Sequence, residues 1–145
     1  DPTGQFAFFW HGAITFAASM YTNNGFADSV GYAWDAMAAD VVSFNGESSQ
    51  AASNANIHAM ARADQTMHEA VIGNNSFISK ELASGNYGYA AHATQDAFAA
   101  GHGYQTYDPN MAISAWANHL WQDTVPNPMR LGVAFFATVN MFSKP

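Results

Sequence analysis

The stretch FAFFWHGAITFAASMYTNNG, residues 6–25, decides the fold class. It is apolar and aromatic over several helical turns, shows no strand-like alternation, and ends in an Asn-Gly breaker. We expect a buried helix over residues 6–22. His11, Thr15 and Ser19 interrupt the apolar run, which therefore falls short of the roughly 18 residues that a membrane span needs. No basic segment precedes the run, so we expect no signal peptide.

The same helical signals continue along the rest of the chain. Asp28 is a candidate cap, and Asn127-Pro128 and Asp108-Pro109 each place a capping side chain before a proline suited to the first helical position. We expect further helices over residues 28–44, 49–72, 76–83, 86–101, 108–123 and 127–143. The sequence therefore predicts an all-α fold, a single compact bundle of about six to seven helices around a metal-binding cleft. Residues 1–5 are interpreted as a lead-in and residues 6–145 as one domain.

The composition limits the possible functions. The chain has 145 residues and no cysteine, which excludes disulfides and thiolate metal sites. Only 10% of its residues are charged, and four Lys plus Arg stand against eleven Asp plus Glu, for a net charge of -7. So few cations cannot build the basic patch that is typical of a nucleic-acid-binding surface. The excess of acids indicates either an ordinary acidic domain or carboxylates neutralised by bound divalent cations.

Histidine and aspartate recur at helical spacing. His92 and Asp96 stand at positions i and i+4 of one expected helix, and His119 and Asp123 repeat the spacing on another. His102 follows the break at Gly101, where the chain can turn back towards the same place. A single pair would be read as a hydrogen bond on a helix surface. Two pairs and a third histidine favour a metal site, because imidazole and carboxylate are ligands that zinc accepts.

The pattern His92-x-x-x-Asp96-x-x-x-x-x-His102, followed by His119-x-x-x-Asp123, resembles that of the zinc-dependent phospholipase C family. The fungal single-strand nucleases share that family's fold, which is all-helical and holds three zinc ions. The resemblance implies that His92 and Asp96 bind one zinc ion and that Asp96 bridges to a second. It implies that His102, His119 and Asp123 form a separate site.

The resemblance extends to the amino-terminal half of the chain. It implies as further ligands an early histidine, an aspartate on the second helix and a histidine on the third, which are His11, Asp40 and His58 here. The family's last carboxylate is usually Glu where this chain has Asp123, and its amino-terminal Trp corresponds to no terminal residue here. We expect two to three zinc ions, with a smaller centre of one metal left open.

Several other residues are weaker candidates. His68 lies off the face of His58 and is interpreted as a surface or supporting residue. Asp35 and Asp64 are candidate bases without an assigned role, and solvated helix faces are the simpler interpretation. Trp34 is expected in the core.

The first four residues, Asp1-Pro2-Thr3-Gly4, resemble the Asp-Pro-x-Gly junction that closes the core of Rhs-type polymorphic toxins. The resemblance implies a carboxyl-terminal toxin domain delivered by its parent polypeptide through a type VI secretion apparatus. It also implies a cognate immunity protein and contact with the parent Rhs shell. We therefore expect a secreted effector that is delivered into a target cell without a signal peptide of its own.

Together these features predict a zinc-dependent phosphodiester hydrolase, phospholipase C-like, that acts as an antibacterial toxin domain. A phospholipid or a membrane surface is the expected partner, because the chain is aromatic and poor in cations. A nuclease of the same fold is the first alternative, with nucleic acid the less expected partner. A non-enzymatic toxin that inserts residues 6–21 and 131–143 into membranes is the second. A metal-stabilised binding domain is the third.

Overall fold

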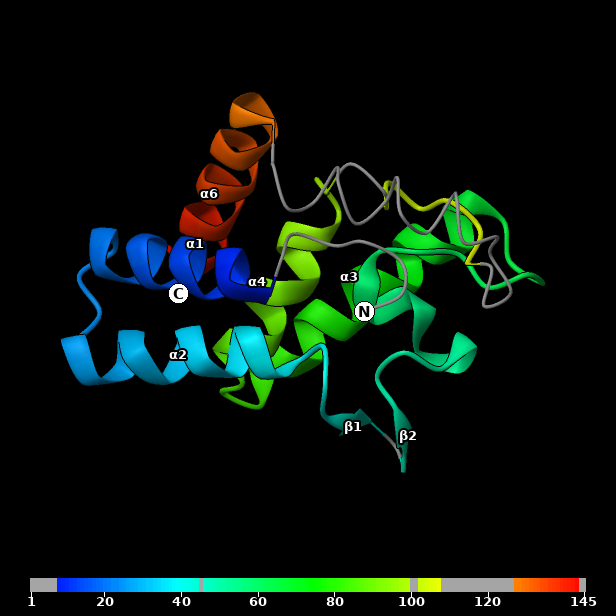
Figure 1. The fold of residues 1–145 in the computed structure, drawn as a ribbon, viewed down its shortest axis with the longest axis horizontal. Coiled ribbons are helices and arrows are strands. Elements are labelled where there is room, and N and C mark those ends of the chain that lie inside the picture. The colour runs from blue at the N-terminus through cyan, green and yellow to red at the C-terminus, as the bar shows by residue number, and fades with distance from the viewer. Residues whose placement is uncertain (1–7, 45, 100–101, 108–126, 144–145) are drawn as a thin grey trace.

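The computed structural model describes residues 8–44, 46–99, 102–107 and 127–143, and this part of the chain is largely helical (Figure 1). Its elements, in chain order, are α1 (Phe8–Tyr21), α2 (Phe26–Ala38), β1 (Ser43–Phe44), β2 (Glu47–Ser48), the 3-10 helix η1 (Ala52–His58), α3 (Met67–Ala83), α4 (Tyr87–Asp96) and α6 (Pro128–Phe142). Within the described residues the two strands pair only with each other, in an antiparallel hairpin. The predicted all-α bundle is confirmed.

Helix α4 lies at the centre of the bundle and contacts α1, α2, α3, α6 and η1. Its small residues allow these close approaches, because Ala90, Ala91 and Ala93 are all completely buried. At Gly88 the packing is tighter still. A Cβ atom there would lie 2.5 Å from the carbonyl oxygen of Tyr32 on α2, so only glycine fits this crossing. The central helix therefore contributes both small packing residues and, at its carboxyl end, polar ones.

Local capping signals predicted some helix ends and missed others. Asn127 caps α6 as expected, since its side chain accepts a hydrogen bond from the backbone nitrogen of Met129 at 2.9 Å. Helix α2 begins earlier than predicted, with Gly25 rather than Asp28 at the capping position. Helix α3 begins at a capping box of Thr66 and Glu69, which satisfies two backbone donors reciprocally.

The prediction of one helix over residues 49–72 is wrong. The segment forms the short η1, which ends where Ala59 adopts a left-handed conformation, and α3 starts only at Met67. The expected break at residues 73–75 is absent, because Gly73 lies inside α3 against the side chain of Asn56. Tertiary packing overrides the local propensity in both places.

Two further boundaries differ from the prediction. Helix α2 ends at Ala38 instead of residue 44, and the chain continues through a turn into the β1–β2 hairpin. Helix α4 ends at Asp96 instead of residue 101. The expected helix over residues 108–123 lies outside the described residues. In the part of the chain that the structure describes, no helix has the length and apolar character to span a bilayer.

Candidate metal centre

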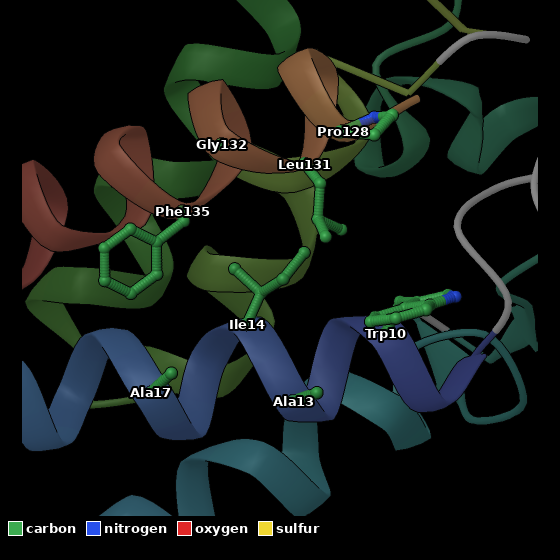
Figure 2. Close-up of a pocket in the computed structure, with 8 residues that line it drawn as sticks. All are labelled: Trp10, Ala13, Ile14, Ala17, Pro128, Leu131, Gly132 and Phe135. Atoms are coloured by element: carbon green, nitrogen blue, oxygen red, sulfur yellow. The ribbon is translucent and has the colours of Figure 1, made fainter. Parts of the chain in front are cut away.

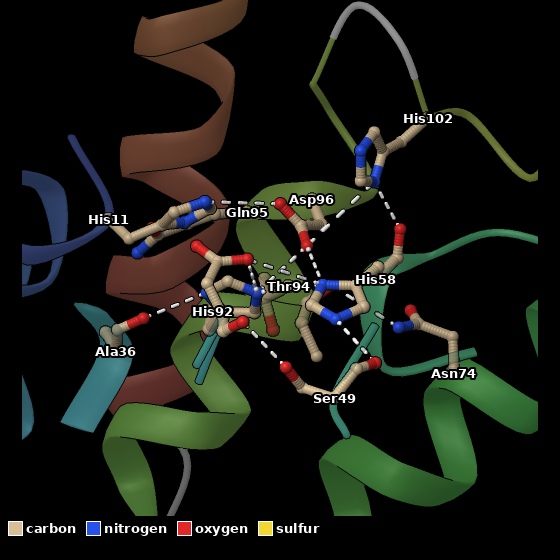
Figure 3. A network of polar contacts seen from close by, with 12 residues as sticks. His11, Ala36, Ser49, His58, Asn74, His92, Thr94, Gln95, Asp96 and His102 are labelled. Carbon is tan, nitrogen blue, oxygen red and sulfur yellow. Dashed lines mark hydrogen bonds and ion pairs between the residues drawn. The ribbon is translucent and has the colours of Figure 1, made fainter. Parts of the chain in front are cut away.

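Six of the predicted ligands meet in one buried cluster beside the carboxyl end of α4. Figure 3 shows the histidines of this cluster around Asp96. Each of the six residues comes from a different part of the chain except for the pair on α4, and none is more than 6% exposed. The cluster comprises His11 of α1, Asp40 in the turn after α2, His58 at the end of η1, His92 and Asp96 of α4, and His102. These six residues are candidate metal ligands, and in that sense we call them the metal centre.

Asp96 is the hub of the metal centre and uses both carboxylate oxygens. Its Oδ2 atom lies 3.0 Å from Nε2 of His92 and 3.1 Å from Nδ1 of His58. Its Oδ1 atom lies 3.3 Å from Nε2 of His11. One carboxylate therefore faces histidine nitrogens on two sides.

Asp40, in the turn after α2, lies near the same nitrogens of His92 and His58. Its Oδ1 atom lies 3.7 Å from Nε2 of His92 and 3.8 Å from Nδ1 of His58. Its backbone carbonyl accepts a hydrogen bond of 2.7 Å from the Ser49 hydroxyl, which ties the turn after α2 to the loop before η1. Two aspartates thus converge on one pair of imidazole rings.

The outer nitrogen of each histidine in this group is engaged by an acceptor. Nδ1–H of His92 donates to the carbonyl of Ala36 at 2.9 Å, and Nε2–H of His58 donates to the carbonyl of Ser49 at 3.2 Å. A neutral imidazole carries one N–H, so the inner nitrogens present lone pairs. These inner nitrogens lie only 3.2 Å apart, beside two carboxylates. Such an arrangement requires a cation between the two rings, either a proton or a metal ion.

The pKa values reflect this concentration of negative charge. Burial opposes the charged form of His92, but the charges of Asp96 and Asp40 outweigh it and raise the pKa to about 9. Burial also opposes the charged form of Asp96, which by itself would raise the pKa of this carboxyl group. The charges of His92, His102 and His11 outweigh burial and hold the pKa of Asp96 well below its usual range. Asp96 is therefore ionised, and without a metal ion a proton on His92 balances part of its charge.

His11 and His102 are neutral imidazoles at physiological pH. Burial, followed by repulsion from His92, lowers the pKa of His11 to about 4. Burial also lowers the pKa of His102. Nδ1–H of His102 donates to the carbonyl of His58, and within the described residues its buried Nε2 atom has no hydrogen-bond partner. Neutral imidazole is the form that binds metal.

The ligand atoms form two overlapping groups that could hold a metal ion, with His92 common to both. One comprises His11, Asp40 and His92, and the other comprises His58, His92 and Asp96. Within each group the ligand atoms lie within 4.8 Å of one another. Nitrogen and oxygen donors with no sulfur suit zinc and other divalent metals of borderline or hard character.

The remaining predicted site residues lie elsewhere. His119 and Asp123 are outside the described residues. His68 is exposed on α3, and Asp64 is exposed and pairs with Arg62 at 3.1 Å. Asp35 is half-buried on α2. The expectation that Trp34 lies in the core is wrong, because this side chain is 66% exposed.

Four groups that orient the histidines could not be predicted from the sequence. Three are the backbone carbonyls of Ala36, Ser49 and His58, which carry no residue-type signal. The fourth is the side chain of Gln95, which accepts a hydrogen bond of 2.9 Å from Nδ1–H of His11. Its position directly before Asp96 was the only available clue.

The fold and the site define an all-helical protein with a buried histidine and aspartate centre that can hold a metal ion. No family model, no curated protein and no solved structure matches the chain. Any assignment of function therefore depends on the chemistry of the metal centre and of the surface around it.

Proposed function

We propose that this protein is a zinc-dependent phosphodiester hydrolase, phospholipase C-like, that acts as an antibacterial toxin domain. The observation that supports it best is the convergence of His58 and His92 on Asp96. Their inner nitrogens lie 3.2 Å apart, each with its other nitrogen engaged by a backbone carbonyl. Imidazole nitrogens that are held in place with lone pairs facing a carboxylate are what a metal site needs.

The proposed zinc ligands come from the two overlapping groups described above. His58, His92 and Asp96 would hold one ion, and His11 and Asp40 would hold a second ion beside Asp96. Bound zinc supplies a Lewis acid for phosphoryl oxygens and lowers the pKa of a coordinated water towards about 7. The protein's residues hold the imidazoles in one tautomer and keep Asp96 ionised.

Charge balance favours an anionic substrate. Asp40 and Asp96 contribute two negative charges among imidazoles that are neutral once a metal displaces the His92 proton. Two divalent ions would leave the metal centre with net positive charge in a buried, low-dielectric environment. A phosphodiester carries one negative charge and can be attracted there without a basic side chain, which suits a chain with four Lys plus Arg.

An exposed apolar face on α1, α2 and α6 favours a lipid over a nucleic acid. Helix α1 contains no charged residue. Between α1 and α6 lies an open groove of about 370 Å³ lined by Trp10, Leu131 and Phe135 among other apolar residues (Figure 2). A second groove of about 340 Å³, between α1 and α2, is lined on the α2 side by Trp34. We call these two grooves and the helix between them the apolar face.

The apolar face suits an uncharged acyl phase, and the chain's net charge of -7 suits zwitterionic rather than anionic headgroups. A nucleic acid would meet neither a basic patch nor a row of cations there. We therefore propose a phospholipid with a zwitterionic headgroup as the substrate class. The proposed nuclease activity is retained as the alternative, since zinc itself can hold a scissile phosphate.

The toxin assignment is a separate proposal that rests on the Asp1-Pro2-Thr3-Gly4 resemblance. It includes delivery into a target cell by an Rhs shell and neutralisation by a cognate immunity protein. Expression of the chain in a bacterium tests it. Growth should stop with the wild-type chain and continue with Asp96→Asn, and continued growth with both chains, each produced in soluble form, would contradict it.

The test of the metal centre is elemental analysis of the purified protein beside two variants. Asp96→Asn removes the hub carboxylate, and we expect it to reduce a content of two to three zinc ions per chain. His68→Ala is the matched control, because it removes an exposed histidine from α3 and should leave the content unchanged. Wild-type protein without bound metal after zinc has been supplied would refute the hydrolase proposal.

Substrate assays separate the alternatives. Wild-type protein should release a phosphorylated headgroup from phosphatidylcholine vesicles in a chelator-sensitive reaction that Asp96→Asn lacks. Cleavage of single-stranded DNA without lipid hydrolysis would instead establish the nuclease. Vesicle leakage that persists in Asp96→Asn and after chelation would support a non-enzymatic membrane-inserting toxin. Metal binding with neither activity would leave a metal-stabilised binding domain.

A further inference from the structure

Gln95 is a completely buried glutamine on α4 whose side chain joins three helices. Its oxygen accepts the 2.9 Å hydrogen bond from Nδ1–H of His11 on α1. Its amide nitrogen donates to the hydroxyl of Thr15, also on α1, at 2.8 Å and to the hydroxyl of Thr138 on α6 at 3.3 Å. All polar atoms of this amide are thus engaged, and Figure 3 shows it beside His11 and Asp96.

Thr138 determines which way the Gln95 amide faces. The Thr138 hydroxyl donates its only proton to the carbonyl of Ala134, four residues earlier on α6, at 2.7 Å. It can therefore only accept from Gln95. The amide nitrogen must face Thr138, and the amide oxygen must face His11. A flipped amide would place an oxygen against a hydroxyl with no proton to give.

The orientation of Gln95 in turn selects the tautomer of His11. Because an amide oxygen faces Nδ1, that nitrogen must carry the proton. The Nε2 atom of His11 then turns a lone pair towards Oδ1 of Asp96, 3.3 Å away. These two atoms are a ready pair of ligands on the side of Asp96 opposite His58.

We propose that Gln95 is a positioning residue that holds His11 as its Nδ1–H tautomer and so makes Nε2 available to a metal ion on the Oδ1 side of Asp96. The tautomer depends only on the hydrogen bonds within the protein. The effect on metal binding rests on the proposed function. Thr138 orients Gln95, and Gln95 orients His11. A residue of α6 thus helps to position a proposed ligand on α1.

Four variants isolate this role. Gln95→Leu removes the acceptor for Nδ1–H. Gln95→Glu keeps an oxygen in that place, and as a buried protonated carboxyl it still has a proton to donate to Thr138. Thr138→Val removes the hydroxyl that orients the amide while preserving the shape of the side chain. Thr94→Val is the matched control. Thr94 also donates to a carbonyl four residues earlier on its helix, at 2.8 Å, but its hydrogen bonds in the described residues do not involve Gln95.

The first measurement is long-range proton–nitrogen NMR of metal-free protein labelled with 15N-histidine, with His11 assigned through a His11→Gln variant. Wild-type, Gln95→Glu and Thr94→Val proteins should show the Nδ1–H tautomer. In Gln95→Leu and Thr138→Val the Nε2–H tautomer should appear, because Nε2–H can then donate to Asp96. The same tautomer in Gln95→Leu and Thr138→Val as in wild type would overturn the proposal.

The second measurement is zinc affinity by chelator competition. We expect affinity to fall about 10- to 100-fold in Gln95→Leu and Thr138→Val and to be largely kept in Gln95→Glu and Thr94→Val. A tautomer switch with unchanged affinity would overturn the metal-positioning part of the proposal. If the wild-type protein binds no zinc, the proposed function fails, whereas the NMR result still decides whether Gln95 sets the tautomer.

Discussion

His92 is the residue on which the negative charge of the metal centre acts most strongly. It donates outward to the Ala36 carbonyl and faces Asp96 and Asp40 inward. In the metal-free protein these contacts raise its pKa to about 9, whereas burial lowers the pKa of His11 to about 4. The two histidines therefore impose opposite pH dependences on the free energy of unfolding.

We predict that the metal-free protein is most stable near pH 6.5, the ordinary pKa of histidine. The contribution of His92 is fully present below 6.5 and is lost as the pH rises through about 9, because the folded state holds that proton more tightly. Stability is also lost as the pH falls from 6.5 towards about 4, because the unfolded state protonates His11 more readily.

Thermal unfolding of chelator-treated protein between about pH 4.5 and 9.5 measures both limbs. His68→Ala removes an exposed histidine outside the metal centre and should reproduce the wild-type profile. A melting temperature that stays constant or rises between pH 6.5 and 9 would contradict the charge balance described for His92.

Some features of the site could be predicted from the sequence, and others could not. The i, i+4 spacing of His92 and Asp96 was visible because a helix of known pitch places both on one face. The acceptors that orient the rings could not be predicted, since three are backbone carbonyls and the fourth is a glutamine. No residue-type pattern encodes a contact between segments 84 residues apart, as for His11 and Gln95.

At the scale of elements, the crossing of α2 and α4 connects packing to the metal centre. Gly88 contacts the backbone of α2 near Tyr32, and one turn further along, the Ala36 carbonyl of α2 holds His92 of α4. The two helices must stay in close contact for that hydrogen bond to form. Helix packing and ligand orientation are therefore coupled at one crossing.

We predict that Gly88→Ala lowers the free energy of unfolding by about 1–3 kcal/mol, because the added methyl group clashes with α2. It should also weaken zinc binding, since the displaced Ala36 carbonyl would orient His92 less well. Denaturant unfolding and chelator competition measure the two effects.

Gly31→Ala on α2 is the control for this prediction. Nothing lies within 4 Å of a Cβ placed at Gly31, so alanine there should leave zinc affinity unchanged and raise helix stability by up to about 1 kcal/mol. Equal zinc affinity in Gly88→Ala and the wild type would show that the crossing does not set His92.

Elements with strong local signals were predictable, and those without them were not. The apolar run of α1 and the Asn127-Pro128 start of α6 lie where the sequence indicated. The region between residues 49 and 66 resembles a helix in composition, but η1 ends at His58, where Ala59 turns into a left-handed conformation. His58 contacts Asp96 and Asp40 at this helix end, and tertiary contacts of this kind outweigh helical propensity.

At the scale of the whole molecule, the metal centre joins α1, the turn after α2, η1 and α4. A ligand that binds only the folded state stabilises it by about 4 kcal/mol at a free concentration of 1,000 times its Kd. We predict that chelation lowers the melting temperature by about 10 °C and that added zinc restores it. The melting temperature of Asp96→Asn should respond less to zinc than that of the wild type, and wild-type protein unaffected by chelation would contradict a stabilising metal.

The apolar face provides a second prediction at this scale. We expect the protein to partition onto phosphatidylcholine vesicles and Trp34→Ser to weaken partitioning by about tenfold, since the exposed indole would enter the acyl region. Ile72→Ser is the matched control, because Ile72 is 52% exposed on α3, outside the apolar face. Sedimentation with vesicles measures both. Equal losses in the two variants would show that the apolar face has no particular role.

The sequence by itself determined the all-α class, the positions of α1 and α6, and the histidines and aspartates worth considering as ligands, because helical pitch and capping act over a few residues. Only the tertiary structure decided that His11, Asp40, His58, His92, Asp96 and His102 share one buried cluster. It also decided which nitrogen each ring presents, because that depends on acceptors brought in by other helices. Short-range signals specify elements, whereas the buried charges of the metal centre are compensated only by contacts between elements distant in the chain.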